Sequence, residues 1–214
     1  MTVRKLRKQD QWELMQICAD TAIVGKPIDP LFSDRELFAE LMLGYYLNDE
    51  PKHTLVVEEE GDVVGYLTGS TNPRAQWGII KSGAPVVWDM ADKLVSGEYA
   101  ESPQNRQFLK WLFTRMPLEM PKHPKNSAHA HFNLMERVRG RGLGPLLISS
   151  ALDLFREDLQ GLDYLYGEVI AHPGKSLSEF ERMGFEIYDK KRTTLYEGHL
   201  QGPVHLACIV KPLK

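Results

Sequence analysis

Three glycines at alternate positions in the segment Arg139–Gly144 suit a loop that binds a phosphorylated ligand. Without every second Cβ, backbone N–H groups can converge on an anion, and a following helix N-terminus adds about half a positive charge. Full charges come from Arg137, Arg139 and Arg141. The dinucleotide pattern G-x-G-x-x-G fails because Pro145 takes the third glycine's place when the count starts at Gly140. The Gly-Lys-Ser/Thr of a P-loop is absent.

Titratable side chains precede and follow this loop along the chain. His129 and His131 lie two residues apart just before it, and Asn133 follows at the same spacing. Histidine titrates near neutral pH and can act as a base there. Glu168 lies in an otherwise apolar stretch, where a carboxylate needs a partner or a raised pKa, and such a group often marks a site. The alternative is that the two histidines are a structural pair, hydrogen-bonded to neighbouring strands.

The elements around the loop must position these groups. Residues 131–135 favour a strand, and a helix is predicted to open at Pro145. Its apolar residues recur at helical spacing: Leu147, Ile148, Ala151, Leu152 and Phe155. Residues 164–171 are nearly all apolar, which indicates a central strand parallel to the first. Strand, helix and strand together predict a right-handed βαβ unit.

The remaining elements follow from local signals. Strands are predicted at 2–6, at 54–60 and 63–69 as a hairpin around Gly61-Asp62, and as a final pair at 193–197 and 204–210. Asp10, with Glu13 three residues on, predicts a helix start, and Asp34 a second one. The apolar surface of the second helix includes Tyr45 and Tyr46, which are either core aromatics or residues that contact a substrate. Pro173-Gly174 is predicted to open a short helix that Gly184 stops.

Composition limits the classes of function. At 43% hydrophobic and 26% charged residues, the 214-residue chain can bury an ordinary core. A net charge of −3 argues against non-specific nucleic-acid binding. Cys18 and Cys208 have no metal-ligand partner nearby, so we expect no metal site and a reduced, cytoplasmic protein. No apolar run approaches the length of a membrane span, and the N-terminus lacks the apolar core of a signal peptide.

Arg139-x-x-Gly142-x-Gly144 after a strand resembles the acetyl-CoA loop of the GNAT acyltransferase superfamily. The strand before, the helix after and the later Met183-Gly184-Phe185 fall in the family's order, so the resemblance covers most of the chain. It implies an α/β (α+β) GNAT fold, a mixed central sheet of about six to seven strands flanked by helices. Residues 1–214 would form one domain. The alternatives for the loop are a glycine-rich connection without a ligand and an Arg-Gly segment that touches RNA.

The segment 71–126 departs from the usual short connection between the third and fourth strands. Helices are predicted at 87–95 and 103–116, and Trp77, Trp88 and Trp111 lie in this insert. Long insertions with helices of their own are more often functional than idle. We expect a lid or wall over the acceptor site, with a homodimer contact as the competing role.

The resemblance also implies the site and the reaction. Acetyl-CoA would be the co-substrate, with its pyrophosphate on the loop and its pantetheine arm along the preceding strand. The expected contacts are Phe132, Asn133, Leu134, Arg139, Gly140, Arg141, Gly142, Leu143, Gly144 and Pro145. An unknown amine acceptor, of a small molecule or a protein, would attack the thioester directly, with a strand N–H steadying the oxyanion. The candidate bases are His129, His131 and Glu168, with His172, Tyr188 and Tyr196 as weaker ones.

Several positions depart from the family's pattern. Phe180 stands where many members have a proton-donating Tyr, Pro173 where an Asn often contacts the cofactor arm, and Ser176 where a small Ala is usual. A bulge is expected in the fourth strand, which leaves open which histidine faces the cleft. The segment from Pro124 to Gly144 is also similar to the acetyltransferase-like domain of O-GlcNAc hydrolases and its free-standing bacterial relatives. The main expectation is an N-acetyltransferase, and the alternative is a non-catalytic acyl-CoA-binding module.

Overall fold

A mixed β-sheet organises the residues that the computed structural model describes, 1–174 and 177–214. These residues form seven strands in the order β1-β2-β3-β4-β5-β7-β6. Their bounds are β1 Thr2–Lys5, β2 Thr54–Glu59, β3 Asp62–Ser70, β4 Ser127–Leu134, β5 Tyr164–Ala171, β6 Glu186–Arg192 and β7 His205–Pro212. All neighbouring pairs are antiparallel except β4 and β5, which are parallel. The predicted mixed sheet and the parallel pair on either side of the glycine loop are confirmed.

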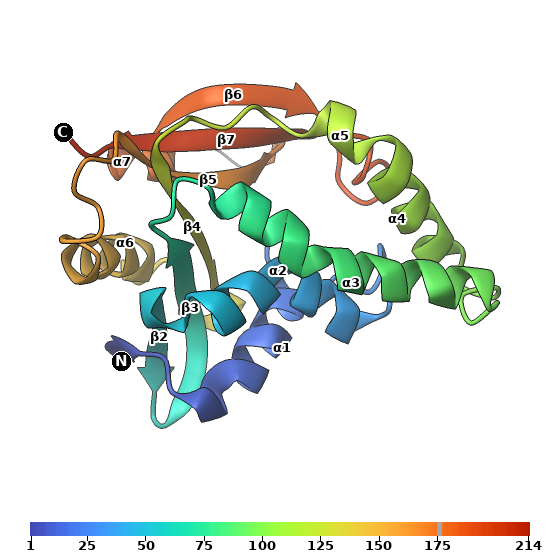
Figure 1. Ribbon diagram of the computed structural model, residues 1–214, viewed down its shortest axis with the longest axis horizontal. Coiled ribbons are helices and arrows are strands. Elements are labelled where there is room, and N and C mark those ends of the chain that lie inside the picture. The colour runs from blue at the N-terminus through green and yellow to red at the C-terminus, as the bar shows by residue number, and fades with distance from the viewer. Residues whose placement is uncertain (175–176) are drawn as a thin grey trace.

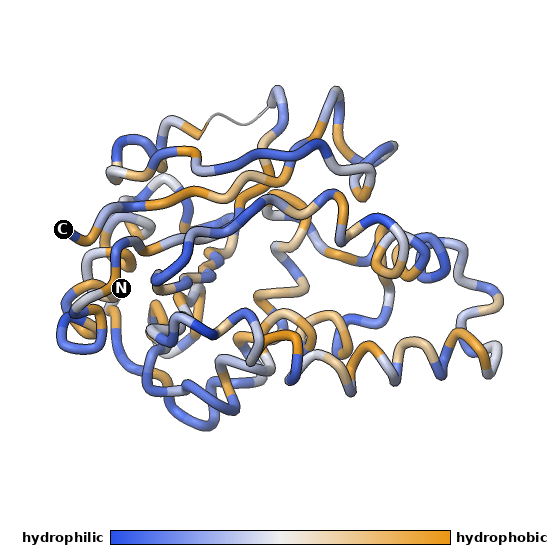
Figure 2. The backbone as a smooth tube through the Cα atoms, turned by 45° about the horizontal axis from the view of Figure 1, so that its top comes forward, coloured by the Kyte–Doolittle hydropathy of each residue, from blue (hydrophilic) through white to orange (hydrophobic). Residues whose placement is uncertain are grey.

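Helices cover both faces of this sheet (Figure 1). They are α1 Gln11–Thr21, α2 Arg35–Asp49, α3 Ala75–Val95, α4 Pro103–Thr114, α5 Met116–Glu119, α6 Leu143–Leu154 and α7 Ser178–Arg182. One core cluster joins α1, α2 and the insert to the β2 and β3 side chains Val56 and Tyr66. A second joins α6 to the opposite face through Val57, Leu67 and Leu165. Figure 2 shows hydrophobic stretches along the interior strands and hydrophilic ones at many surface loops.

The last two strands differ from the prediction. The strand before β7 is β6, Glu186–Arg192, whereas Thr193–Glu197 is a turn. β6 lies at the edge of the sheet and pairs only with β7, so its charged side chains remain in solvent and hide the strand signal. The turn is fixed instead by Glu119, whose Oε2 accepts hydrogen bonds from Thr193 Oγ1 at 3.0 Å and Thr194 N at 2.7 Å.

The two predicted helix starts have different outcomes. Asp34 caps α2 as expected, because its Oδ1 accepts from Leu37 N at 3.3 Å. Asp10 precedes α1, but its side chain makes no cap hydrogen bond to that helix. Its carboxylate instead binds Arg4 at 2.7 Å and accepts from Arg7 N at 2.6 Å. The full charge of Arg4 is a stronger partner than a helix N–H, so Asp10 ties β1 to the turn before α1.

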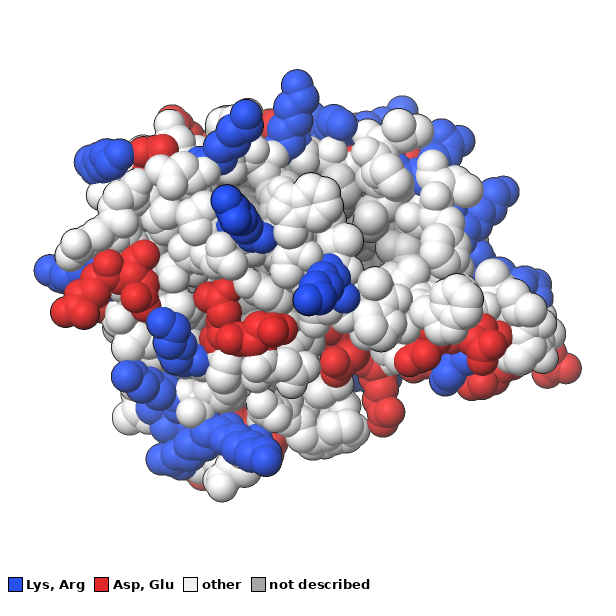
Figure 3. Space-filling view, in the orientation of Figure 1, with Lys and Arg blue, Asp and Glu red and all other residues white. Residues whose placement is uncertain are grey.

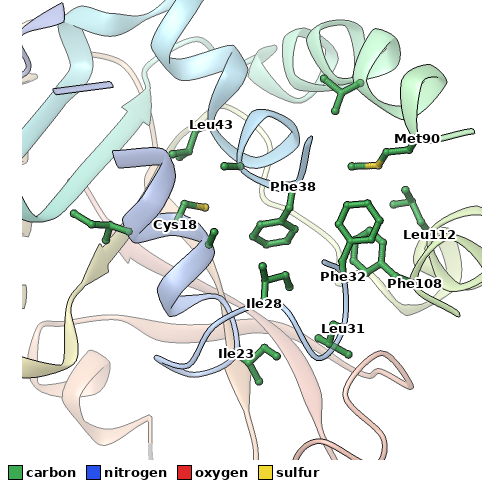
Figure 4. Close-up of a cluster of buried hydrophobic side chains, with 14 of the residues drawn as sticks. Cys18, Ile23, Ile28, Leu31, Phe32, Phe38, Leu43, Met90, Phe108 and Leu112 are labelled. Atoms are coloured by element: carbon green, nitrogen blue, oxygen red, sulfur yellow. The ribbon is translucent and has the colours of Figure 1, made fainter. Parts of the chain in front are cut away.

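The insert is helical, as predicted, with other bounds. α3 begins at Ala75, not at residue 87, and runs through Pro85, while the predicted helix 103–116 ends at Thr114 and is followed by α5. Side chains of the insert pack into the core beneath α2: Figure 4 shows Met90, Phe108 and Leu112 around Phe32 and Phe38. The insert is therefore an integral part of the hydrophobic core.

The short helix near the C-terminal end also begins later than predicted. α7 starts at Ser178, not at Pro173-Gly174, and Gly184 stops it with φ +82° as expected. Ser176 lies outside the described residues. No helix of the described chain is long and apolar enough to cross a membrane.

Candidate functional site

β4 and β5 part at the middle of the sheet, and the candidate site lies at that opening. Their parallel pairs run from Ser127–Tyr164 to His129–Tyr166, and the described residues make no further β4–β5 pair. A close contact marks the point of separation, because a Cβ on Gly167 would lie 2.7 Å from Ala130 O. Beyond it, β4 continues to Leu134 and β5 to Ala171. The two strands thus leave a gap between them at their carboxyl ends.

Two residues of β4 turn their backbone groups toward this gap. β4 pairs with β3 without a register shift from His129 to Leu134, so the bulge expected in this strand is absent there. Met135 N donates to Val64 O on β3 at 2.9 Å. Because the direction of the backbone N–H and C=O groups alternates along a strand, residues 133, 131 and 129 also direct these groups toward β3. Phe132 and Leu134 therefore direct their backbone N–H and C=O groups toward β5.

The glycine loop lies at the end of this free edge. Gly140 and Gly142 have φ of +74° and +77°, which favours glycine, and Gly142 caps α6. A Cβ built on Gly140, Gly142 or Gly144 would meet nothing within 4 Å, so the surface above the loop is open. α6 begins at Leu143, not at Pro145. The N–H groups of its first turn have no acceptor within the helix and can bind an anion.

The three arginines of this region are held differently. Arg139 donates from Nε to Leu134 O at 3.0 Å and from Nη1 to Val24 O at 3.4 Å, so it fastens the loop to the segment after α1. Arg137 and Arg141 both pair with Glu59 on β2, at 2.6 and 3.1 Å. Glu59 therefore offsets part of the positive charge, and the backbone N–H groups are the main anion-binding feature.

On the α1–α2 face of the opening, His129 joins Tyr46 to Glu168. Its Nε2 lies 2.7 Å from Glu168 Oε2, and its Nδ1 lies 2.5 Å from Tyr46 Oη. A carboxylate accepts only, so Nε2 carries the proton and the Nδ1 of the neutral ring accepts from Tyr46. His129 is buried, whereas the Glu168 side chain is 26% exposed. Both ring nitrogens are used, and the carboxylate remains accessible.

A residue that sequence reasoning missed, His123, completes the cluster. It lies between α5 and β4, and its Nε2 is 2.6 Å from Glu168 Oε1, although poorly aligned for a hydrogen bond. Burial alone would raise the pKa of Glu168, but its close contacts with His129 and His123 outweigh burial and hold the pKa well below its usual range. In the sequence, the only signal for His123 was its place between Pro121 and Pro124 in an irregular segment.

His131 lies on the same face and is left without a polar partner. Within the described residues, nothing hydrogen-bonds to its buried Nδ1. Its ring packs edge-on against Tyr66, 5.7 Å between centroids, and Tyr66 Oη accepts from Asn133 Nδ2 at 3.0 Å. Burial lowers the pKa of His131 to about 4. The ring is therefore neutral at physiological pH, and its Nδ1 is buried and unpaired within the described residues.

The other predicted residues lie in various places. Tyr45 and Tyr46 are buried, and Tyr46 is both a core aromatic and a partner of His129. Tyr196 is buried, Tyr188 is exposed on the edge strand β6, and His172 accepts from Gly174 N through Nδ1 at 3.2 Å. Phe180 packs near Phe132, 6.1 Å between ring centroids, on the α6 side of the sheet. The three weaker candidate bases, His172, Tyr188 and Tyr196, do not contact the Glu168 cluster.

The described residues contain no group of three or more His, Cys, Asp or Glu side chains placed to hold a metal ion. The contacts of Glu168 with His129 and His123, and of His129 with Tyr46, hold the cluster together. It can hold a positively charged or hydrogen-bonding group beside the opening.

Comparisons with solved structures identify the fold. The structure named SsHAT is similar over 99% of this chain and 97% of that one, with TM-score 0.62 and 22% identity. A GCN5-related N-acetyltransferase from Kribbella flavida covers 99% and 97%, with TM-score 0.59 and 16% identity. YncA from Salmonella typhimurium, solved with its cofactor acetyl-CoA, covers 100% and 94%, with TM-score 0.57 and 16% identity.

These similarities show that the chain has the GNAT fold, as predicted. No family model and no curated protein matches the chain. The similarity to the acetyltransferase-like domain of O-GlcNAc hydrolases stays a prediction.

Proposed function

We propose that this chain is an acetyl-CoA-dependent N-acetyltransferase that acts on a primary amine of a small molecule or a protein. The observation that carries the proposal is the free β4 edge, with the glycine loop at one end and the Glu168 cluster at the other. A GNAT fold provides the framework, and the structure of YncA with acetyl-CoA is an example of that fold with this ligand. We treat residues 1–214 as one domain with 71–126 as its insert.

The residues present fit the proposed co-substrate. The open space over Gly140, Gly142 and Gly144 admits a pyrophosphate to the first-turn N–H groups of α6. The N–H groups of Phe132 and Leu134 and the C=O group of Phe132 suit the amide-bearing arm, whereas Leu134 O already accepts from Arg139. Bound there, acetyl-CoA supplies a thioester as the acetyl donor. Asn133 contributes less, because its backbone faces β3 and its side chain binds Tyr66.

We assign Glu168 the role of binding the amine of the acceptor. Its carboxylate is ionised and partly exposed, so it can hold and orient an ammonium acceptor, whose proton passes to solvent because a carboxylate with a lowered pKa is a weak base. His129 is a positioning residue, because Tyr46 and Glu168 occupy both of its ring nitrogens. His131 has a neutral ring whose Nδ1 is buried, so we assign it no direct contact with the amine.

The insert forms one wall of this acceptor site. Gln76 on α3 donates to Tyr166 Oη at 3.4 Å, and the Tyr166 ring packs at a tilt against His129, with 4.7 Å between ring centroids. Gly78 admits the Tyr45 ring, because a Cβ there would lie 2.3 Å from Tyr45 Cε2. We infer that the start of α3 and the end of α2 together select the acceptor.

A non-catalytic acyl-CoA-binding module is the second candidate, and Phe180 favours it. Phe180 has no proton to give to a leaving thiolate, and its ring lies among Phe132 and Phe185. Two measurements separate the candidates: calorimetric titration with acetyl-CoA and CoA, and thiol release with a panel of amines. Binding with amine-dependent thiol release supports the enzyme. Binding without it supports the module, and no binding contradicts both.

A further inference from the structure

The outer face of α3 carries an apolar stripe that the site does not use. Trp77, Ile80, Trp88 and Val95 are 74%, 62%, 74% and 87% exposed, and Ala84 and Ala91 fill the stripe between them. All six fall on one side of a helix with 3.6 residues per turn. Large contiguous apolar patches on a surface mark interaction sites. We therefore expect the stripe to be the binding surface for another molecule.

α3 is held firmly by its opposite face. Near its start, Ala75 and Ile79 pack against Tyr45 and Tyr46. In its middle, Met90 is fully buried in the core. Near its end, Lys93 Nζ lies 2.9 Å from Asp34 Oδ2. The stripe is thus presented on a rigid helix, which costs a partner little ordering on binding.

Charges beside the stripe change sign along the helix. Arg74 and Lys81 lie beside its first half, and Asp89, Asp92 and then Glu98 lie beside and beyond its second half. Figure 3 shows this arrangement as uncharged surface along α3, with a positive group near its first half and negative groups near its second. If α3 of a second copy packed antiparallel to this one, the positive first half of each helix would lie beside the negative second half of the other.

Four of the apolar positions are self-complementary in the same register. With a two-fold axis at the level of Val86, Trp77 faces Val95 of the second copy and Trp88 faces the small Ala84. The same axis sets Lys81 of one copy within a turn of Asp92 of the other. Such isologous contacts are the commonest way in which soluble chains assemble. We propose that this chain forms a two-fold dimer through antiparallel contact of α3 helices, with Trp77 and Trp88 as its anchors.

Sedimentation of the full chain over a range of concentrations tests the dimer. We expect reversible self-association, and Trp88→Lys should weaken it more than about tenfold, as for an aromatic anchor. Trp12→Lys, at the exposed Trp12 of α1, is the matched control and should leave it unchanged. A monomeric wild type, or a Trp88→Lys variant that dimerises normally with a wild-type circular dichroism spectrum, overturns the proposal.

A charge exchange tests the register. Lys81→Asp should weaken the dimer because like charges then face each other, and Lys81→Asp/Asp92→Lys should restore it. Within one chain the two positions are about 16 Å apart along the helix, so rescue must occur between copies. If the double variant dimerises no better than the single one, antiparallel contact of α3 is wrong.

Discussion

Tyr46 on α2 donates a hydrogen bond to His129 Nδ1 on β4, at 2.5 Å. This contact sets the tautomer of the ring and directs its Nε2–H to Glu168, 2.7 Å away. Tyr46 is buried, and burial with the nearby Glu168 charge raises its pKa well above the ordinary value, so it remains a donor. A helix on one face of the sheet thus orients the carboxylate at the opening.

Tyr46→Phe removes this donor and leaves His129 Nδ1 unpaired. We expect kcat to fall about fivefold to tenfold, the effect of about 1 kcal/mol, with unchanged CoA affinity. Because the His129 ring then loses the donor that sets its tautomer, the pH profile of kcat should also shift. Steady-state kinetics across pH tests this, with Tyr188→Phe on the exposed edge strand as control. A fall in kcat with an unmoved pH profile would leave Tyr46 a packing role only.

Glu168→Gln keeps the shape of the side chain and removes its charge. We expect turnover to fall by roughly a hundredfold or more, because the amine is no longer held in the geometry for attack. CoA affinity by calorimetry should stay within the error of the wild type, because the phosphate loop is not touched. Glu13→Gln, at an exposed position of α1, is the control for charge. Equal loss of CoA binding would show that Glu168 supports the fold and not the reaction.

Gly144→Val places a branched side chain in the open space over the phosphate loop. Gly144 does not have a positive φ, so the change should block CoA binding with little backbone strain. Gly142→Val should block it too, at an added cost of about 1–2 kcal/mol for its φ of +77°. Gly198→Val, at φ +85° between β6 and β7, carries similar strain away from the loop. Retained CoA affinity in Gly144→Val would place the phosphate site elsewhere.

His131 makes the stability of the fold depend on pH. Its pKa falls from 6.5 to about 4 on folding, so the unfolded chain binds the proton first as pH decreases. The stability that the neutral ring contributes is present above pH 6.5 and declines toward pH 4, by about 3 kcal/mol in all.

His131→Gln should remove much of this decline. Urea unfolding at pH 7.5 measures how far the substitution itself changes the free energy of unfolding. Unfolding at pH 4.5 also includes the effect of protonating His131 in the unfolded chain. The variant should lose less stability between the two pH values than the wild type does. An equal loss in both proteins would mean that His131 is protonated in the folded state.

Phe180→Tyr restores a hydroxyl at the position where many members of the family have one. If proton delivery to the leaving thiolate limits the reaction, thiol release should increase by several-fold while CoA affinity stays constant. The Phe180 ring is only partly buried, so the added hydroxyl should not unfold the chain. An unchanged or lower rate in a folded variant would show that this position does not limit turnover.

Local patterns in the sequence were enough to predict β4, the glycine loop, α6 and β5, because alternation, glycine spacing and helical periodicity are short-range signals. They did not reveal β6, whose charged edge resembles a loop, or the start of α3. The pair of Tyr46 and His129 joins residues 83 positions apart, and His123 comes from an irregular segment. Such contacts arise only when α2, the insert and the sheet pack together.

The most direct test is release of free CoA thiol from acetyl-CoA by the wild type and by Glu168→Gln, with and without a broad panel of primary amines. The account predicts that at least one amine raises the wild-type rate above the acceptor-free rate, and that Glu168→Gln loses this increase while still binding CoA. A wild type that binds acetyl-CoA but never exceeds the acceptor-free rate would contradict it.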